Sequence, residues 1–413
     1  MESIVHLIEG DCEAYSQKGT QTKVIVSDDC ISSIERKHIR GTGFRVIAGG
    51  CQGFAYTTDE NRIKEAAKLA SELATVSSEV KQVPAPQKYS KVGGLLDPRL
   101  QDMDTATIEE IATDMLRGVT EKGGHILYGS VEVTKFFHEI VTSYGVHGSF
   151  YETSCYAGID VKVDGFFGTE TLYTRNSSFD PYALGQRATE LALASKNPQK
   201  IKGGIMPVIL RPPAASKFFE HAVVPLFLAD NLDNKMSVFG KIGEKVTSEI
   251  TITDDGTLEG GIGSRSFDGE GVPCKKTVIV EKGILQSFLF DTTAAFQYGA
   301  ESTGNAVRSS FRVPPIMYIT NLAITSGRST DELIETIRNG IVVNDIVGSF
   351  SFDYSTGKFG FEAKNVFSID RGEIKHAAAD VTIVGRIGDI LQTVEPGNDV
   401  KQEGLLFVVL FEK

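Results

Sequence analysis

Alternating apolar and polar positions in the first part of the chain predict a β meander over residues 21–57. Asp28-Asp29 and Gly49-Gly50 fall between its apolar runs, and two-residue turns of these types connect antiparallel strands. From about Asp59 the apolar side chains recur at helical spacing, which predicts a helix. Strands with one apolar face, followed by a helix with one apolar stripe, indicate a small α+β layer.

A second unit is predicted after a Pro- and Gly-interrupted connector at 77–104. It begins with a helix from about Thr107 that Gly123-Gly124 closes. Separate strands follow to about residue 174, including 126–133 and 138–143. A further helix should then start at Asp180-Pro181, because Asp caps helix N-termini and Pro suits the first helical position.

From Gly203 onward, short strand-like runs alternate with Gly-rich turns, and two helices interrupt them. One helix is predicted over 214–229, and the other starts at Ser329, where Glu332 completes a capping box. This pattern indicates a large, mainly antiparallel β domain. The runs at 287–290 and 405–410 are among its predicted strands.

These patterns together predict an α+β fold in three parts. The first is an N-terminal α+β domain with its connector at 1–104, and the second is a middle α/β segment at 105–202. The third is the β-rich C-terminal domain at 203–413.

Charge and cysteine usage narrow the functional classes. The 413 residues include 42 Lys and Arg against 54 Asp and Glu, a formal net charge of −12, which argues against direct nucleic-acid binding. Five scattered Cys without a Cys-x-x-Cys pair indicate neither a zinc ribbon nor a disulfide framework. With no signal peptide and no long apolar run, we expect a cytoplasmic protein without a membrane partner.

Two His-Glu combinations are candidates for metal chemistry. A zinc peptidase helix needs two His on one face with a Glu to activate water. After His138-Glu139 the next imidazole is His147, and the flanking residues alternate as in a strand, so this pair predicts no metal site. Cys155 also lies in a predicted strand without a neighbouring His, and no Gly-x-Ser-x-Gly elbow occurs.

Glu220-His221 is the second combination, and it lies on the helix predicted over 214–229. Positions 224 and 225 are Val and Pro, so neither residue has a ligand partner at helical spacing. Pro225 lacks a backbone donor and should kink or end the helix near Val224. The residues by themselves therefore define no catalytic or metal-binding set.

A series of short motifs in the C-terminal half follows a distinctive order. The motifs are Ser237–Val246, Asp254–Thr257, Asp268–Pro273, Glu281–Leu285, Thr303–Asn305, Gly357–Phe359 and Gly397–Asp399. In their order and spacing they resemble the TldD/TldE (PmbA) family, once called modulators of DNA gyrase. The N-terminal meander from Ser33 to Phe54 is similar to the first domain of that family, so the resemblance covers nearly the whole chain.

This resemblance implies a metal-dependent peptidase system of two related subunits. In TldD-type chains a helix after a Pro-Val-Leu-like strand carries His-Glu-x-x-x-His, and a late Cys supplies a third ligand. Here the strand is Pro207–Leu210, and Glu220, His221 and Pro225 stand at the three motif positions. No Cys follows Gly397–Asp399. The resemblance is therefore to the TldE/PmbA side, which implies no catalytic residues and no metal ligands in this chain, with zinc only in a TldD-type partner.

Three functional hypotheses follow. The first is a non-catalytic subunit that pairs with a TldD-type chain and helps to process unfolded peptides. The second is a self-sufficient metallopeptidase with a rearranged site around Glu220 and His221. The third is a homodimer that binds peptides by strand addition without hydrolysis. The wide apolar stripe of Phe218, Val223 and Phe227 has either a core role or a role in dimerisation.

Overall fold

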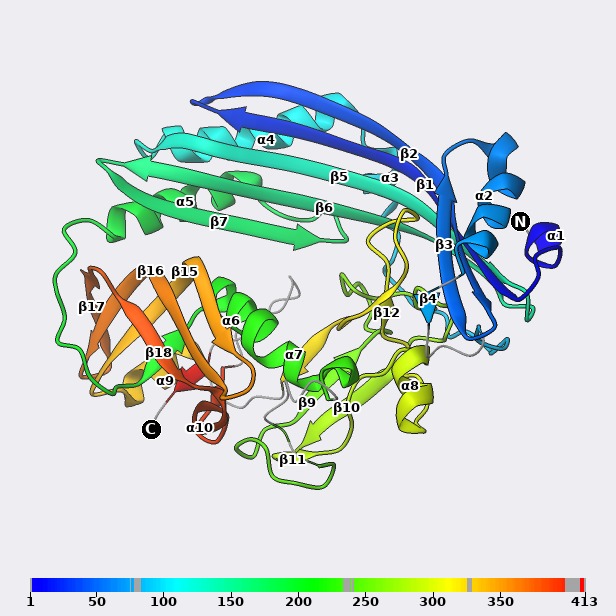
Figure 1. The fold of residues 1–413 in the computed structure, drawn as a ribbon. Coiled ribbons are helices and arrows are strands. Elements are labelled where there is room, and N and C mark those ends of the chain that lie inside the picture. Colours follow the sequence, from blue (N-terminus) through cyan, green and yellow to red (C-terminus); the bar gives the residue numbers. More distant parts are fainter. Residues whose placement is uncertain are drawn as a thin grey trace.

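A seven-stranded antiparallel sheet forms one layer of the molecule and arches over the C-terminal elements (Figure 1). The computed structural model describes residues 2–74, 76–77, 83–232, 239, 241–324, 329–397 and 409–411. The strand order of the sheet is β4-β3-β2-β1-β5-β6-β7. The strands are β1 (Asp11–Ser27), β2 (Cys30–Ala48), β3 (Cys51–Thr57), β4 (Val76–Ser77), β5 (His125–Thr142), β6 (His147–Val163) and β7 (Phe166–Thr174).

Both predicted two-residue turns of the meander are confirmed. Asp28 and Asp29 join β1 to β2 with φ values of 49° and 61°. Gly49 and Gly50 join β2 to β3 with φ values of 58° and 77°. Two successive positive φ angles define the hairpin turn whose twist matches that of the flanking strands.

The strands are longer than the sequence pattern predicts, and they connect regions that the prediction separated. The segments 126–133 and 138–142, expected as parts of two strands, belong to the single strand β5, and Ser143 begins the following turn. Strand β1 pairs with β5 as well as with β2, so the strands on either side of residue 104 share one sheet. Pairing between strands more than 100 residues apart produces no pattern in the local sequence. The sequence around residue 104 therefore could not show that the two sides of the predicted boundary share a sheet.

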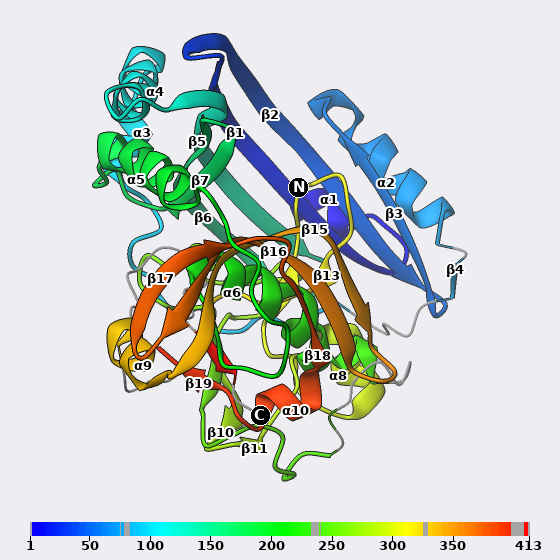
Figure 2. The same ribbon diagram turned by 90° about the vertical axis from the view of Figure 1, so that its left-hand side faces the viewer.

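The helices of the N-terminal half pack on a single face of this sheet. They are α1 (Glu2–Val5), α2 (Ile63–Glu72), α3 (Pro98–Asp102), α4 (Thr105–Thr120) and α5 (Pro181–Ala194). Figure 2 shows α4 and α5 side by side at one end of the sheet and α2 at the other. The helices α4 and α5 touch through Gly118 and Gly185, where an added Cβ would meet backbone oxygen at 2.1 Å. Asp104 and Asp180 cap the two helices.

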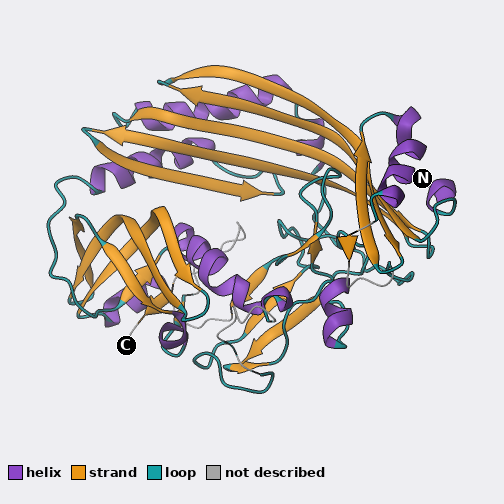
Figure 3. Ribbon diagram, in the orientation of Figure 1, coloured by secondary structure: helices purple, strands orange, loops and turns teal. Residues whose placement is uncertain are grey.

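The C-terminal part contains two main sheets and five short α-helices among its described residues (Figure 3). The larger sheet holds β8 (Val208–Leu210), β15 (Asn339–Asp353), β16 (Lys358–Asp370), β17 (Glu373–Ala378), β18 (Thr382–Arg386), β19 (Glu395–Pro396) and β20 (Val409–Phe411). The smaller holds β9 (Ile252–Asp255), β10 (Lys276–Glu281), β11 (Ile284–Leu285) and β14 (Leu322–Ile324), beside a pair of β12 (Ala306–Val307) and β13 (Ile316–Met317). The helices are α6 (Pro212–Phe218), α7 (Val224–Phe227), α8 (Thr292–Tyr298), α9 (Thr330–Thr336) and α10 (Ile387–Leu391).

The mainly antiparallel pairing confirms the predicted α+β class, with β8 and β15 as a parallel pair. The capping box of Ser329 and Glu332 is also confirmed. Residues 287–290 do not form the predicted strand, because only Leu289 makes a bridge, to Leu228. Of the predicted strand at 405–410, residues 405–408 lie outside the described part of the chain. Among the described residues, we find no helix that is both long and apolar enough to cross a membrane.

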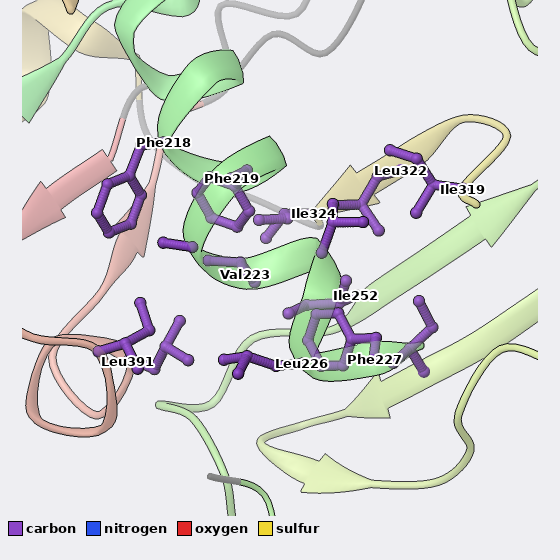
Figure 4. Close-up of a cluster of buried hydrophobic side chains, with 14 of the residues drawn as sticks. Phe218, Phe219, Val223, Leu226, Phe227, Ile252, Ile319, Leu322, Ile324 and Leu391 are labelled. Atoms are coloured by element: carbon purple, nitrogen blue, oxygen red, sulfur yellow. The ribbon is translucent and has the colours of Figure 1, made fainter. Parts of the chain in front are cut away.

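The apolar stripe of the segment 212–227 lies entirely in the core of the C-terminal part (Figure 4). Phe218, Val223 and Phe227 are each 0% exposed and pack with Ile252 of β9 and Leu391 of α10. Burial of each such side chain contributes about 1.5–3 kcal/mol. The stripe therefore serves the core, and the alternative role in dimerisation that we considered for it is wrong.

The large sheet contacts the C-terminal part at both of its ends. At the β7 end, Lys364 donates to Thr169 at 3.0 Å, and Asn365 donates to the carbonyl of Phe167 at 2.7 Å. Immediately after β7, Arg175 donates to the carbonyl of Gly261 at 2.8 Å. Near α2, a buried ion-pair network that includes Arg45 of β2 joins the two parts. These contacts set the position of the sheet relative to the C-terminal domain.

The buried network alternates two acids with two guanidinium groups. Arg45 of β2 contacts Glu13 of β1 at 2.7 Å and Glu270 of the C-terminal part at 2.8 Å. Arg308 pairs with the second carboxylate oxygen of Glu13. None of these four side chains is more than 3% exposed. Burial lowers the pKa of Arg308 to about 9, so it keeps its charge at neutral pH and the four charges balance.

We expect the substitution Arg45→Met to lower the free energy of unfolding by about 3–5 kcal/mol, because it removes the guanidinium group that pairs with the buried Glu270 and leaves Glu13 with Arg308 alone. Urea-induced unfolding measures this loss. The matched control is Lys37→Met, which removes a cation from the exposed pair with Glu35 and should cost no more than about 1 kcal/mol. Equal small losses in the two variants would contradict the role assigned to the network.

Candidate functional site

The local fold determines how the residues at the positions that the resemblance assigns to the metal motif are placed. Strand β8 ends at Leu210, and Pro212 and Pro213 occupy the first turn of α6, where missing backbone donors are tolerated. The buried phenylalanines fix which face of the helix turns inward. Glu220 and His221 consequently lie on the opposite, exposed face.

Glu220 does have a specific partner. The hydroxyl of Tyr318 donates to its Oε1 at 2.9 Å. Burial of Tyr318 and the nearby Glu220 carboxylate both raise the pKa of the phenol, so it remains a neutral donor at physiological pH. The carboxylate is therefore held by a hydroxyl in the position that the resemblance assigns to the first zinc ligand.

Pro225 disturbs the helix on its N-terminal side, as predicted. Residues Phe219–Val223 form a π turn, in which the N–H of Val224 donates to the carbonyl of Phe219. Because proline has no N–H, the carbonyl of His221 loses the donor that a regular helix would supply. The hydroxyl of Tyr354 donates to that carbonyl at 3.3 Å and replaces the missing bond. The chain then continues as the short helix α7.

The side chains at this position do not fit a zinc site. A catalytic zinc takes three protein ligands, whereas Glu220 is hydrogen-bonded to Tyr318 and Pro225 has no donor atom. Within the described ranges, no group of three or more His, Cys, Asp or Glu side chains is placed to hold a metal. The segment in which the resemblance would put the late Cys, after Gly397, lies outside those ranges, and the sequence has no Cys beyond Cys274.

The other sequence candidates have structural roles. His138 is 5% exposed on β5, and its two ring nitrogens hydrogen-bond to Tyr15 and Glu152 at 2.8 Å each. Arg175 contacts the same Glu152 at 3.0 Å. Both partners lower the pKa of Glu152 to about 2, against the effect of its burial. Cys155 is buried, and its burial raises the pKa of its thiol to about 12, so it is not a nucleophile.

The family motifs meet one another in the interior. Asn305 donates to the carboxylate of Asp254 at 2.7 Å, and Thr320 donates to it through both its N–H and its hydroxyl at 2.8 Å. Asp268 accepts the backbone N–H groups of Glu270 and Val272 at 2.9 Å. All three acids are buried. These motifs therefore build a polar frame for the C-terminal domain, which reaches the N-terminal sheet through Glu270.

The sequence patterns did not reveal this frame, because the residues that complete it come from distant parts of the chain. The partners of Glu270 and Arg308 lie 225 and 295 positions away in the chain, in β2 and β1. One sequence feature could have indicated that these acids are buried. They occur repeatedly in Gly-rich segments that also contain large apolar residues, such as Val272 and Phe267. That signal identifies buried acids without identifying their partners.

Comparison with known proteins agrees with the fold and the motif positions. The family description "PmbA/TldA metallopeptidase C-terminal domain" matches residues 203–408, and "PmbA/TldA metallopeptidase domain 1" matches residues 12–74. An uncharacterized protein of Methanocaldococcus jannaschii is 31% identical over 405 residues, which cover 96% of this chain and 93% of that protein. The chain belongs to the TldD/PmbA family. The resemblance seen in its sequence is thereby confirmed.

Relatives of this family include proteins named as peptidases. A metalloprotease of the same archaeon is 30% identical over 96% of this chain and 91% of its own length. A PmbA homologue of Haemophilus influenzae is 25% identical over 88% and 82%. TldE from Thermococcus kodakarensis has the same fold, with a TM-score of 0.88, 23% identity and coverage of 100% of this chain and 98% of that one. A putative modulator of DNA gyrase from Thermotoga maritima also matches with a TM-score of 0.88, at 21% identity over 97% and 95%.

The contact between Tyr354 and the π turn can be tested by a double-mutant cycle. Tyr354→Phe should cost about 0.5–1 kcal/mol of unfolding free energy, because it removes the hydrogen bond from the Tyr354 hydroxyl to the His221 carbonyl. In a Pro225→Ala background the cost should shrink, since the new backbone N–H at position 225 can bond to that carbonyl. Tyr318→Phe is the control and should cost the same in both backgrounds. Independence of positions 225 and 354 would show that the hydroxyl does not replace the helical bond.

Asp291, the N-cap of α8, should make stability depend on pH. Burial and the nearby Glu270 raise its pKa to about 7 from an ordinary value of 3.8. Its stabilising contribution is therefore fully present below about pH 4 and is lost as pH rises to about 7. Asp291→Asn keeps a good N-cap and should gain stability over the wild type between pH 4 and pH 8.

Urea unfolding at pH 4, 6 and 8 measures this difference. Asp104→Asn is the matched control, because this N-cap on α4 has its pKa lowered by hydrogen bonds from Thr107. The control should lose stability relative to the wild type as pH rises. A wild-type-like pH profile for Asp291→Asn would show that Asp291 is ionised in the folded protein throughout.

Proposed function

We propose that this chain is the non-catalytic, TldE/PmbA-type subunit of a metallopeptidase that processes unfolded peptides, with a TldD-type chain as its catalytic partner. The observation that carries this proposal is the helix of Glu220, His221 and Pro225. It stands where the family's zinc motif belongs, and its donor atoms do not match that motif. The fold shared with TldE at a TM-score of 0.88 supports the same assignment.

The local structure also favours a role other than metal binding for this helix. Zinc coordination requires ligands held in one rigid arrangement. Here the exposed face is interrupted by the π turn at Phe219–Val223, and Tyr318 and Tyr354 bind its polar groups. With Pro225 in place, the turn geometry of this helix therefore differs from that of a regular helix. In the proposed complex, zinc and the water-activating Glu belong to the partner chain.

We expect the purified chain to hold no stoichiometric zinc and to cleave no peptide alone. When it is mixed with a TldD-type chain, metal-dependent hydrolysis of an unfolded peptide should appear or increase at least about tenfold. Elemental analysis and a fluorogenic peptide assay measure the two quantities. His221→Ala in this chain should leave the activity of the mixture unchanged, whereas alanine at a zinc ligand of the partner should abolish it.

The same assays distinguish the other two hypotheses. About one zinc per chain that disappears in His221→Ala, together with cleavage by the single chain, would establish a self-sufficient peptidase instead. Peptide affinity without turnover, even with the partner present, would favour a homodimeric peptide-binding protein. Light scattering gives the oligomeric state of the chain alone and of the mixture.

A further inference from the structure

A pocket lies in the C-terminal part, between β10, the segment 287–290 and the end of α8. Its volume is about 790 Å³, which is within the range of pockets that hold small ligands. It is built from a different set of residues than the helix of Glu220 and His221. Its lining residues combine an apolar floor with a basic rim.

The floor of this pocket is aromatic. Phe288 and Phe290 are 4% and 7% exposed, and the ring of Tyr298 stands edge-on to Phe290 with the ring centroids 6.3 Å apart. Ile242 adds an exposed aliphatic side chain at the opening. An apolar side chain of a ligand would leave water by entering between these groups.

The rim is positively charged although the protein as a whole is acidic. Lys241, Lys275 and Lys276 line the opening, against the single acid Glu301. Over the part of the chain that the structure describes, none of these three ammonium groups forms an ion pair. In a chain of net charge −12, three lysines without counter-ions at one pocket favour an anionic ligand.

We propose that this pocket binds the C-terminal carboxylate of a peptide whose last side chain is apolar. The carboxylate pairs with the lysine ammonium groups, while the last side chain packs on Phe288 and Phe290. A free inorganic anion would use the basic rim but not the aromatic floor. The inference rests on the proposed peptide-processing function and adds to it a site that recognises one end of the substrate.

The test is peptide binding to this chain alone, without a catalytic partner. The probes are two fluorescently labelled pentapeptides ending in Phe, one with a free carboxylate and one with a C-terminal amide. The free acid should bind at least about tenfold more tightly. Lys275→Ala with Lys276→Ala should remove most of that preference.

Lys64→Ala with Lys68→Ala, on the exposed face of α2, changes the net charge equally and should leave binding unaltered. Competition with inorganic phosphate tests for a general anion site. Millimolar phosphate would displace the peptide from a general anion site, but it would not displace the peptide from a site that recognises the peptide end. Equal affinity for acid and amide, or full affinity in the double lysine variant, would overturn the proposal. Because no partner is present, failure of this test is distinct from failure of the two-subunit assignment.

Discussion

The relative position of the two halves of the molecule depends on one buried, charge-balanced network. Glu13, Arg45, Glu270 and Arg308 come from strands and loops far apart in the chain, and their charges can be buried only together. Because each guanidinium group contacts fixed carboxylate oxygens, the network permits little sliding of the sheet over the C-terminal domain. The hydrogen bonds of Lys364 and Asn365 to β7 hold the sheet against the C-terminal domain at a second place.

This constraint explains why the family motifs are polar and yet buried. Asp254, Asp268 and Glu270 each accept hydrogen bonds from neighbouring backbone or side-chain donors, which offsets the cost of removing carboxylates from water. Glu270 belongs both to the hydrogen-bonded frame of the C-terminal part and to the buried ion-pair network. Thr292 donates to it within the C-terminal part, and Arg45 contacts it from β2. The frame that shapes the C-terminal domain is thus the same frame that fixes the sheet above it.

Local features of the fold were predictable from the sequence because they depend on neighbouring residues. The Asp28-Asp29 turn, the Asp180 cap and the Ser329 capping box all follow from backbone preferences within a few positions. The pairing of β1 with β5 did not follow, because strand register over more than 100 residues is set by the assembled sheet. For the site, the helical location of Glu220 and His221 was predictable, whereas their tyrosine partners, almost 100 or more residues later, were not.

The two faces of the segment 212–227 are under different constraints. On its inner face, Phe218, Val223 and Phe227 are fully buried in close-packed surroundings, so changes in their volume cost several kcal/mol, about 2–5 for truncation to alanine. On its outer face, a proline is accommodated by one π turn and one tyrosine hydroxyl. The core therefore preserves the helix in place while its exposed residues are free to differ between members of one family. A metal site on such a face can be lost without loss of the fold, because no part of the core depends on it.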